Sequence, residues 1–142
     1  MILNRLKKVA ERDQAVKDGK WRDLSLMGTY LGRRTTDGYP GITLGIIGLG
    51  RIGARVAELF QPWDFRIVAY DPYIENDRFI VKGAEKVDLE YLLEHSDVVS
   101  LHCTHNSETD QMMNADLFQK MKSGEFEEGE KVHRRWVPGR QQ

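Results

Sequence analysis

The sequence predicts an α/β fold: a doubly wound parallel sheet, incomplete with about four strands, preceded by an N-terminal helix and followed by an irregular tail. Two observations point to this class. Short apolar runs alternate with segments of helical periodicity, which is the alternation that parallel βαβ units require. The first run, ITLGIIG over residues 42–48, is bounded by glycines and lacks polar alternation, which is typical of a strand buried on both faces.

Composition excludes several other classes. The 142 residues suit one domain, and the formal net charge of −1 gives no electrostatic reason to expect nucleic acid or a charged membrane surface as a partner. No apolar run approaches the roughly 20 residues of a membrane span, and the N-terminal segment lacks the features of a secretory signal. One cysteine, Cys103, excludes an internal disulfide framework and a cysteine-based zinc site. We therefore expect a cytoplasmic protein with no metal centre.

The first part of the chain precedes this α/β pattern. Residues 1–19 are expected to form one amphipathic helix, because their apolar side chains recur near the 3.6-residue period with charged side chains between them. Residues 20–41 contain several glycines and little periodicity, which predicts an irregular connector. The apolar side chains of this connector argue against a free linker.

The α/β domain is expected over residues 42–124. Strands are predicted over 42–48, 65–71, 84–87 and 98–103, the third of them weak. Helices are predicted over 52–60, 88–96 and 115–121, and the last two begin at the N-cap candidates Asp88 and Asn114. The polar stretch between the second and third strands is assigned no element. Residues 125–142 have no apolar period and are expected to be a disordered or irregular tail.

A glycine motif follows the first strand. Residues 48–53, GLGRIG, fit the pattern G-x-G-x-x-G, which is a weak signal on its own. Here the motif follows a buried strand, opens a helix and precedes a second strand that ends in Asp71, 23 residues after Gly48. This context specifies a Rossmann-like dinucleotide site. The alternatives are an ordinary strand-to-helix turn and a methyltransferase-like cofactor site, and the third glycine argues against the latter.

Each residue of the motif has a physical role in such a site. Gly48 makes the tight turn out of the strand, and Gly50 lets a pyrophosphate approach the backbone. Gly53 lets the helix pack close to the sheet. The free amides near Arg51 and Ile52 face the pyrophosphate at the positive end of the helix dipole.

Asp71 is the acidic residue that a dinucleotide site requires after its second strand. Its carboxylate is expected to accept hydrogen bonds from the hydroxyls of the adenosine ribose. Because its negative charge repels a 2′-phosphate, NAD is the expected cofactor rather than NADP.

Four segments occur in a specific order: TLGIIGLGRIGARVA, AYDPY, DLEYLLEHSDVVSLHC and SETDQMMNADLFQKMKSG. Together they resemble the nucleotide-binding domain of the D-isomer-specific 2-hydroxyacid dehydrogenases. The N-terminal segment that ends in AVKDGKW is also similar to the helix and tryptophan before this domain in the family. The resemblance covers roughly residues 2–124.

The resemblance implies a fold, a cofactor and a reaction. The fold is a Rossmann domain, the cofactor is NAD, and the reaction is hydride transfer between the nicotinamide and C2 of a D-2-hydroxy acid. The implied partner is therefore a small-molecule 2-hydroxy or 2-keto acid. The resemblance places Gly48, Gly50, Arg51 and Ile52 at the pyrophosphate, Asp71 at the ribose, Cys103 beside the adenosine, and Thr109 on the loop nearby.

Two side chains near this site are given no catalytic role. His102 is interpreted as a hydrogen-bonded histidine at a strand end. Cys103 is interpreted as a small apolar wall, because nothing beside it in the sequence marks it as a thiolate.

The sequence also departs from the family pattern. Thr104 stands where the SLHC segment is usually followed by proline. After Gly124 the family continues with a strand and an Asn-Thr-Ala-Arg-Gly-like segment that carries the arginine for the substrate carboxylate, and a glutamate and a histidine follow for proton transfer. None of these is matched, so no catalytic residue is assigned. We expect the chain alone to be a non-catalytic fragment or truncated product.

Two further expectations concern partners and function. The strand at 98–103 would form an open sheet edge, which favours self-association or a homo-oligomer. The alternative function is a non-catalytic NAD-binding or corepressor-like interaction module. Turnover with 2-keto acids separates this alternative from the dehydrogenase, because both bind NAD.

Overall fold

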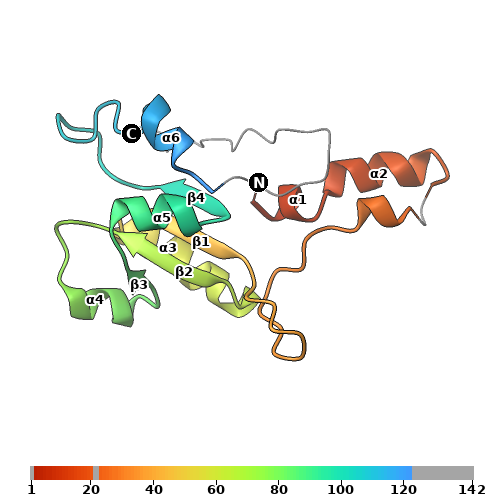
Figure 1. The fold of residues 1–142 in the computed structure, drawn as a ribbon, viewed down its shortest axis with the longest axis horizontal. Helices are drawn as coiled ribbons and strands as arrows, with labels where there is room; N and C mark the ends of the chain where they lie inside the picture. The colour runs from red at the N-terminus through yellow and green to blue at the C-terminus, as the bar shows by residue number, and fades with distance from the viewer. Residues whose placement is uncertain (1, 21–22, 123–142) are drawn as a thin grey trace. The chain divides into compact units, whose positions relative to one another are not determined.

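The computed structural model describes residues 2–20 and 23–122 of the chain (Figure 1). The chain divides into two compact units, Met1–Leu31 and Gly32–Gln142. The tail predicted over residues 125–142 lies outside the described residues. No helix among the described residues is long and apolar enough to cross a membrane.

The N-terminal unit contains two helices, α1 (Ile2–Leu6) and α2 (Val9–Lys17). The prediction of one continuous helix over residues 1–19 must therefore be corrected. Its break lies at Lys8, whose backbone is left-handed with a φ of 49°. A left-handed residue redirects the chain and ends the helical hydrogen-bond ladder, so α2 starts afresh after it.

The connector that follows α2 folds back onto α1. The backbone N–H of Thr29 donates to the carbonyl of Leu6 at 2.8 Å. Gly28 lies so close to α1 that a Cβ on it would sit 2.6 Å from the Cα of Lys7. This part of the predicted connector is therefore held in place by the helix that precedes it in the chain, in agreement with the argument against a free linker.

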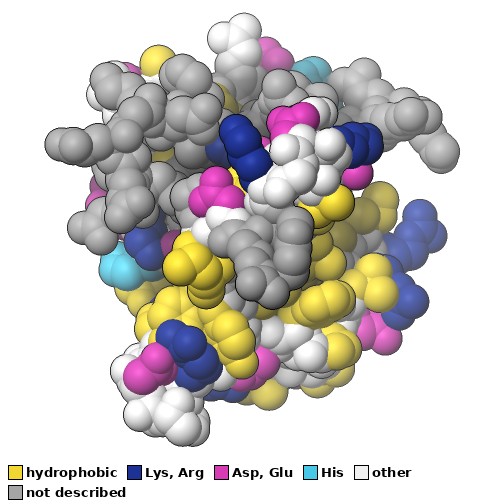
Figure 2. All heavy atoms as spheres, turned by 90° about the vertical axis from the view of Figure 1, so that its right-hand side faces the viewer, with side chains coloured by type: hydrophobic (Ala, Val, Ile, Leu, Met, Phe, Trp, Pro, Cys, Tyr) yellow, Lys and Arg dark blue, Asp and Glu magenta, His cyan; other side chains and the backbone are white. Residues whose placement is uncertain are grey.

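The N-terminal unit leaves much of its apolar surface exposed. Ala15 is the buried residue of α2. The exposed apolar side chains of the unit are Val9, Val16, Leu24, Met27 and Tyr30. On the face of the molecule in Figure 2, hydrophobic side chains lie interspersed with charged ones.

The second unit contains a parallel four-stranded sheet in the order β3-β2-β1-β4 (Figure 1). Its strands are β1 (Thr43–Ile47), β2 (Arg66–Tyr70), β3 (Glu85–Lys86) and β4 (Val98–Leu101). The register pairs Ile47 with both Tyr70 and Leu101, so the carboxyl ends of three strands meet at one edge. This arrangement confirms the predicted fold class.

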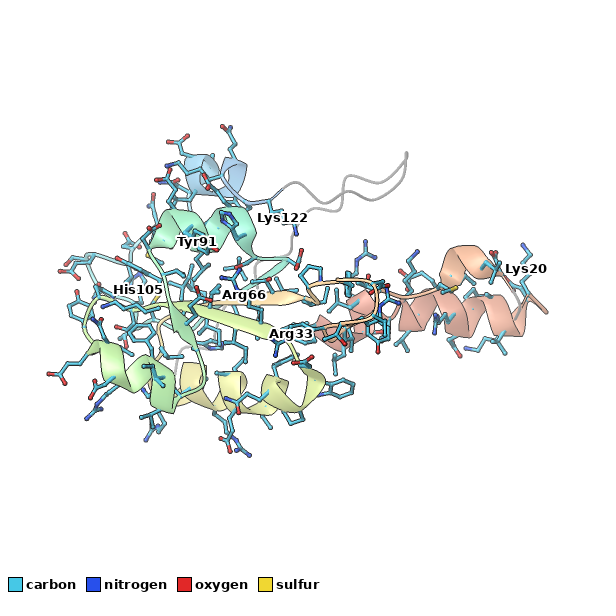
Figure 3. All side chains as sticks on the ribbon, turned by 60° about the horizontal axis from the view of Figure 1, so that its bottom comes forward. Lys20, Arg33, Arg66, Tyr91, His105 and Lys122 are labelled. Carbon is cyan, nitrogen blue, oxygen red and sulfur yellow. The ribbon has the colours of Figure 1, made fainter. Side chains whose placement is uncertain are left out.

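Helices cover both faces of this sheet, as a doubly wound fold requires. They are α3 (Arg51–Phe60), α4 (Asn76–Val81), α5 (Leu89–His95) and α6 (Ala115–Gln119). In Figure 3, α5 and α6 lie on one side of the sheet, and α3 and α4 lie on the other. The sequence assigned no element to the segment that forms α4. Phe79 is the buried residue of this helix, so its sequence shows no apolar period.

The core of the second unit lies between α5 and the strands. Leu92 and Leu93 of α5 pack with Ile47 of β1 and Val68 of β2, and all four are almost fully buried. Every residue of β1 is buried, as the apolar run predicted. The close approach of α5 requires Gly45, where a Cβ would sit 2.3 Å from the Ser96 hydroxyl and 2.7 Å from a Leu92 methyl group.

The two predicted helix caps are confirmed. The carboxylate of Asp88 accepts a hydrogen bond from the Tyr91 amide at 2.7 Å at the start of α5. The side-chain oxygen of Asn114 accepts one from the Leu117 amide at 3.0 Å at the start of α6. The strand predicted to end at Cys103 ends earlier, at Leu101, so the cysteine lies in the loop that follows β4.

Candidate dinucleotide-binding site

The turn out of β1 depends on Gly48. Its φ of 88° is a left-handed conformation that glycine adopts without strain. A Cβ at this position would lie 2.7 Å from the backbone nitrogen of Cys103. Two constraints therefore require glycine here: the backbone conformation and the close contact with the loop after β4.

Gly53 allows α3 to pack against this turn. A Cβ on Gly53 would lie 2.1 Å from the carbonyl oxygen of Gly48 and 3.1 Å from a methyl group of Ile46. Because the first contact is with backbone, a side-chain rotation could not relieve it. Gly53 is buried in the first turn of α3, so the helix start is held directly above the end of β1.

Gly50 differs from the other two glycines of the motif. A Cβ on Gly50 would meet no atom within 4 Å, and its φ of −69° is accessible to every L-residue. Nothing in the described part of the chain therefore demands glycine here. Gly50 is the N-cap of α3, and the next two residues, Arg51 and Ile52, are exposed. The first-turn amides of a helix have no partner within it, so they are available to an anion.

Asp71 follows β2 and is tied to the glycine loop. One of its carboxylate oxygens accepts the amide of Leu49 at 2.9 Å, and the other accepts the amide of Tyr73 at 3.0 Å. These two bonds fix the orientation of the carboxylate. Each carboxylate oxygen has a second lone pair, so Asp71 can accept further hydrogen bonds from a ligand.

Lys82 is a residue of this site that the sequence analysis missed. It is the C-cap of α4, and its ammonium donates to the carbonyl of Leu49 at 2.6 Å. Leu49 itself is fully buried, yet charged side chains take both of its backbone polar groups. No local sequence signal could have revealed this contact, because it depends on where α4 lies.

Cys103 lies beside the glycine turn, as its close contact with Gly48 demonstrates. Burial raises the pKa of its thiol, and the negative charge of Asp71 raises the pKa further. A thiol that resists ionisation is a poor nucleophile, which agrees with the interpretation of Cys103 as an apolar wall.

The hydroxyl of Thr109 makes its hydrogen bonds within its own loop. It donates to the carbonyl of Thr104 at 2.7 Å and accepts the amide of Asn106 at 2.8 Å. Both bonds lie within the loop after β4, so the hydroxyl shapes that loop. The loop is also joined to the segment after β2, because the Tyr73 hydroxyl donates to the carboxylate of Glu108.

A hollow of about 560 Å³ lies next to Asp71. Its lining consists of Tyr70, Asp71, Pro72, Glu85, Lys86, Val87, Asp88 and Tyr91. Behind it, Arg66 donates to the carboxylate of Glu85 at 2.8 Å and to the Tyr91 hydroxyl at 3.1 Å, and both Arg66 and Tyr91 are visible in Figure 3. These bonds hold two lining side chains in place.

His102 follows β4 and continues the hydrogen bonding of this strand to β1. Its amide donates to the carbonyl of Ile47 at 2.7 Å, and its Nε2 lies 2.8 Å from the hydroxyl of Ser100. Burial lowers the pKa of the imidazole, which favours its neutral form. The interpretation as a hydrogen-bonded histidine is confirmed. In the part of the chain that the structure describes, no group of three His, Cys, Asp or Glu side chains gathers in a way that could hold a metal ion.

Comparisons of sequence identify a family for the chain. A model of the family described as "D-isomer specific 2-hydroxyacid dehydrogenase, NAD binding domain" matches residues 1–126. D-3-phosphoglycerate dehydrogenase of Archaeoglobus fulgidus is 35% identical over 124 residues, which are 87% of this chain and 22% of that protein. Glyoxylate reductase of Korarchaeum cryptofilum is 39% identical over 122 residues, which are 86% of this chain and 36% of that protein.

Solved structures agree with the sequence comparisons. D-lactate dehydrogenase from Aquifex aeolicus, solved with NAD and lactic acid, is similar with a TM-score of 0.71 and 31% identity. The match covers 87% of this chain and 34% of that one. D-lactate dehydrogenase from Escherichia coli has a TM-score of 0.69 and 29% identity, over 87% of this chain and 37% of that one. The chain thus spans less than two fifths of each protein it resembles here.

Proposed function

The chain belongs to the NAD-binding domain family of the D-isomer-specific 2-hydroxyacid dehydrogenases, and from this premise we propose that it holds NAD between residues 48–53 and Asp71. In this proposal it is the nucleotide-binding part of an oxidoreductase that acts on the CH–OH group of a D-2-hydroxy acid. The partner of the complete enzyme is a small 2-hydroxy or 2-keto acid.

The observation that carries the proposal is the open space beside Gly50. Gly48 and Gly53 are needed by the protein's own backbone, whereas a Cβ at Gly50 would meet nothing within 4 Å. A ligand that lies against the backbone explains a glycine at such a position. The exposed first turn of α3 is adjacent, and its amides suit the negative charge of a pyrophosphate.

This geometry supports a role for each residue in the proposed site. Amides of Gly50, Arg51 and Ile52 hold the pyrophosphate, and Asp71 accepts hydrogen bonds from the adenosine ribose with its free lone pairs. Cys103 provides a wall beside the adenosine. Thr109 acts through the shape of its loop, because its hydroxyl is bonded within that loop.

Bound NAD supplies the hydride acceptor of the reaction, and the chain's residues bind and orient it. Asp71 also favours NAD over NADP, because its charge repels a 2′-phosphate. No residue of this chain is assigned to proton transfer or to the substrate carboxylate.

We also propose a cytoplasmic location and self-association. The single cysteine, Cys103, is a free thiol, the state that reducing compartments maintain. In the described residues β4 pairs only with β1, which leaves one side of the strand without a strand partner. Such an edge favours pairing with a second copy.

Calorimetric titration with NADH tests the proposal. The chain should bind NADH, and Gly50→Ala should raise the dissociation constant at least tenfold, because the added methyl group enters the space of the pyrophosphate. Asp77→Ala, an exposed change in the first turn of α4, is the control and should leave binding unchanged. Absence of NADH binding at millimolar concentrations, or full affinity in Gly50→Ala, would overturn the proposed site.

A further inference from the structure

We propose that Lys82 is a specificity-determining residue that reduces the discrimination of the site against NADP. The inference rests on the proposed function, because it assumes that the adenosine ribose lies at Asp71. Lys82 adds a positive charge to the site that contains the negative charge of Asp71, and the spacing of the sequence motif does not reveal it. NADH remains the tighter ligand, but the penalty for a 2′-phosphate is smaller than Asp71 alone would impose.

The position of Lys82 is fixed by its surroundings. It ends α4, a helix that is anchored by the buried side chain of Phe79. The next residue, Gly83, has a φ of 68°, and a Cβ on it would collide with the side chain of Gln61. The backbone at Lys82 is therefore held close to the end of α3, and its side chain reaches the glycine loop from there.

The ammonium of Lys82 and the carboxylate of Asp71 are held at the same residue. Lys82 donates to the carbonyl of Leu49 at 2.6 Å, and Asp71 accepts the amide of Leu49 at 2.9 Å. No ion pair joins the two side chains in the described part of the chain. The positive charge of Lys82 and the carboxylate that is proposed to bind the ribose thus contact the two backbone polar groups of one residue, Leu49.

The ammonium can act on a ligand as well as on the loop. It has three N–H donors, and Leu49 takes one of them. The other two can donate to a phosphate oxygen, and a lysine binds phosphate as a point charge. A basic side chain near the ribose is also the general means by which a dinucleotide site accommodates a 2′-phosphate. The repulsion from Asp71 is therefore partly offset.

Titration of the full chain with NADH and with NADPH tests the inference. Lys82→Met should raise the dissociation constant of NADPH about tenfold and that of NADH less than about threefold, because only NADPH carries the extra phosphate. Lys82→Arg should restore the NADPH affinity. The matched control is Lys120→Met, since Lys120 ends α6 and donates to the carboxylate of Glu90 at 2.6 Å; it should change neither affinity.

The outcomes separate a charge effect from a structural one. If Lys82→Met weakens the binding of NADH and of NADPH equally, Lys82 only supports the loop, and the inference is overturned. If Lys82→Met does not fold, Lys82→Gln decides, because glutamine can still donate to Leu49 but is neutral; its NADPH affinity must fall relative to Lys82→Arg. Wild-type binding of NADH without measurable NADPH binding would overturn this inference alone. Failure to bind either nucleotide would overturn the proposed function, and this inference with it.

Discussion

The three glycines of the loop after β1 serve different physical purposes, although the sequence motif treats them alike. A Cβ on Gly53 or on Gly48 would clash with backbone atoms, and Gly48 also needs a left-handed conformation. A Cβ on Gly50 would meet no atom within 4 Å. Substitutions should therefore separate the folding role of the motif from its binding role.

Gly53→Ala should destabilise the fold, because its Cβ would lie 2.1 Å from the Gly48 carbonyl and the backbone has to shift. Overpacking of this kind costs about 3 kcal/mol. Gly50→Ala is the matched control and should cost less than about 1 kcal/mol, since its Cβ meets open space. Urea unfolding followed by circular dichroism measures both, and equal stabilities of the two variants would contradict this account.

Because His102 is half-buried, we expect the free energy of unfolding to depend on pH. Burial lowers its pKa from the ordinary value of 6.5, so the unfolded state binds the proton more tightly than the folded state. The stability contributed by the neutral imidazole is complete above pH 6.5 and falls as the pH drops through 6.5 toward the folded pKa. In His102→Gln, the loss of stability between pH 7.5 and pH 5.5 should be smaller than in the wild type. An identical loss in both proteins would rule out His102 as its source.

At the residue level, the backbone roles of Gly48 and Gly53 were predicted from the sequence because their signal is local. Gly48 and Gly53 lie where the motif requires them, and Asp71 follows β2 with its carboxylate on the amide of Leu49. The contact of Lys82 with Leu49 joins residues that no sequence pattern connects, so it could be found only in the structure.

At the level of elements, regular apolar periods and N-cap residues were the signals that predicted helices and strands correctly. The strand β1 and the helices α3 and α5 were predicted because each has an apolar pattern of its own. The helix α4 was missed because one buried side chain, Phe79, makes no pattern. The break between α1 and α2 was missed because a lysine, Lys8, adopts the left-handed conformation, and lysine carries no signal for it.

The cap of α5 should contribute measurably to stability. The Asp88 carboxylate accepts the amide of Tyr91 at 2.7 Å, and removal of such an N-cap costs about 1 kcal/mol. Asp88→Ala should therefore lower the free energy of unfolding in urea by about this amount. Glu75→Ala is the control, because Glu75 precedes α4 in the same way but makes no side-chain capping bond. Equal effects of the two substitutions would show that the capping bond contributes nothing.

At the level of the whole molecule, the observed order β3-β2-β1-β4 is the order that a doubly wound fold takes, and it places β4 at an edge among the described strands, as predicted for residues 98–103. The division of the chain into the units Met1–Leu31 and Gly32–Gln142 places the boundary inside the predicted connector of residues 20–41. Sequence composition marked the connector as irregular, but it could not indicate where contacts between its two ends are fewest.

Self-association is the prediction that belongs to this scale. Among the described strands, β4 (Val98–Leu101) has a strand partner on one side only, and its residues are half-buried. An edge of this kind can pair with another copy of itself. Light scattering at tens of micromolar should therefore give a mass above that of one chain, decreasing on dilution. A monodisperse monomer at the highest concentration would contradict the prediction.

The central claim is that NAD lies against the start of α3, next to Asp71. A titration of the ¹⁵N-labelled chain with NADH, followed by the amide resonances, tests it residue by residue. We expect the amide resonances of Gly50, Arg51 and Ile52 to shift together with that of Asp71, while those of α6 on the opposite side of the sheet stay in place. Saturable shifts that leave the glycine loop unaffected, or no shifts at all, would contradict it.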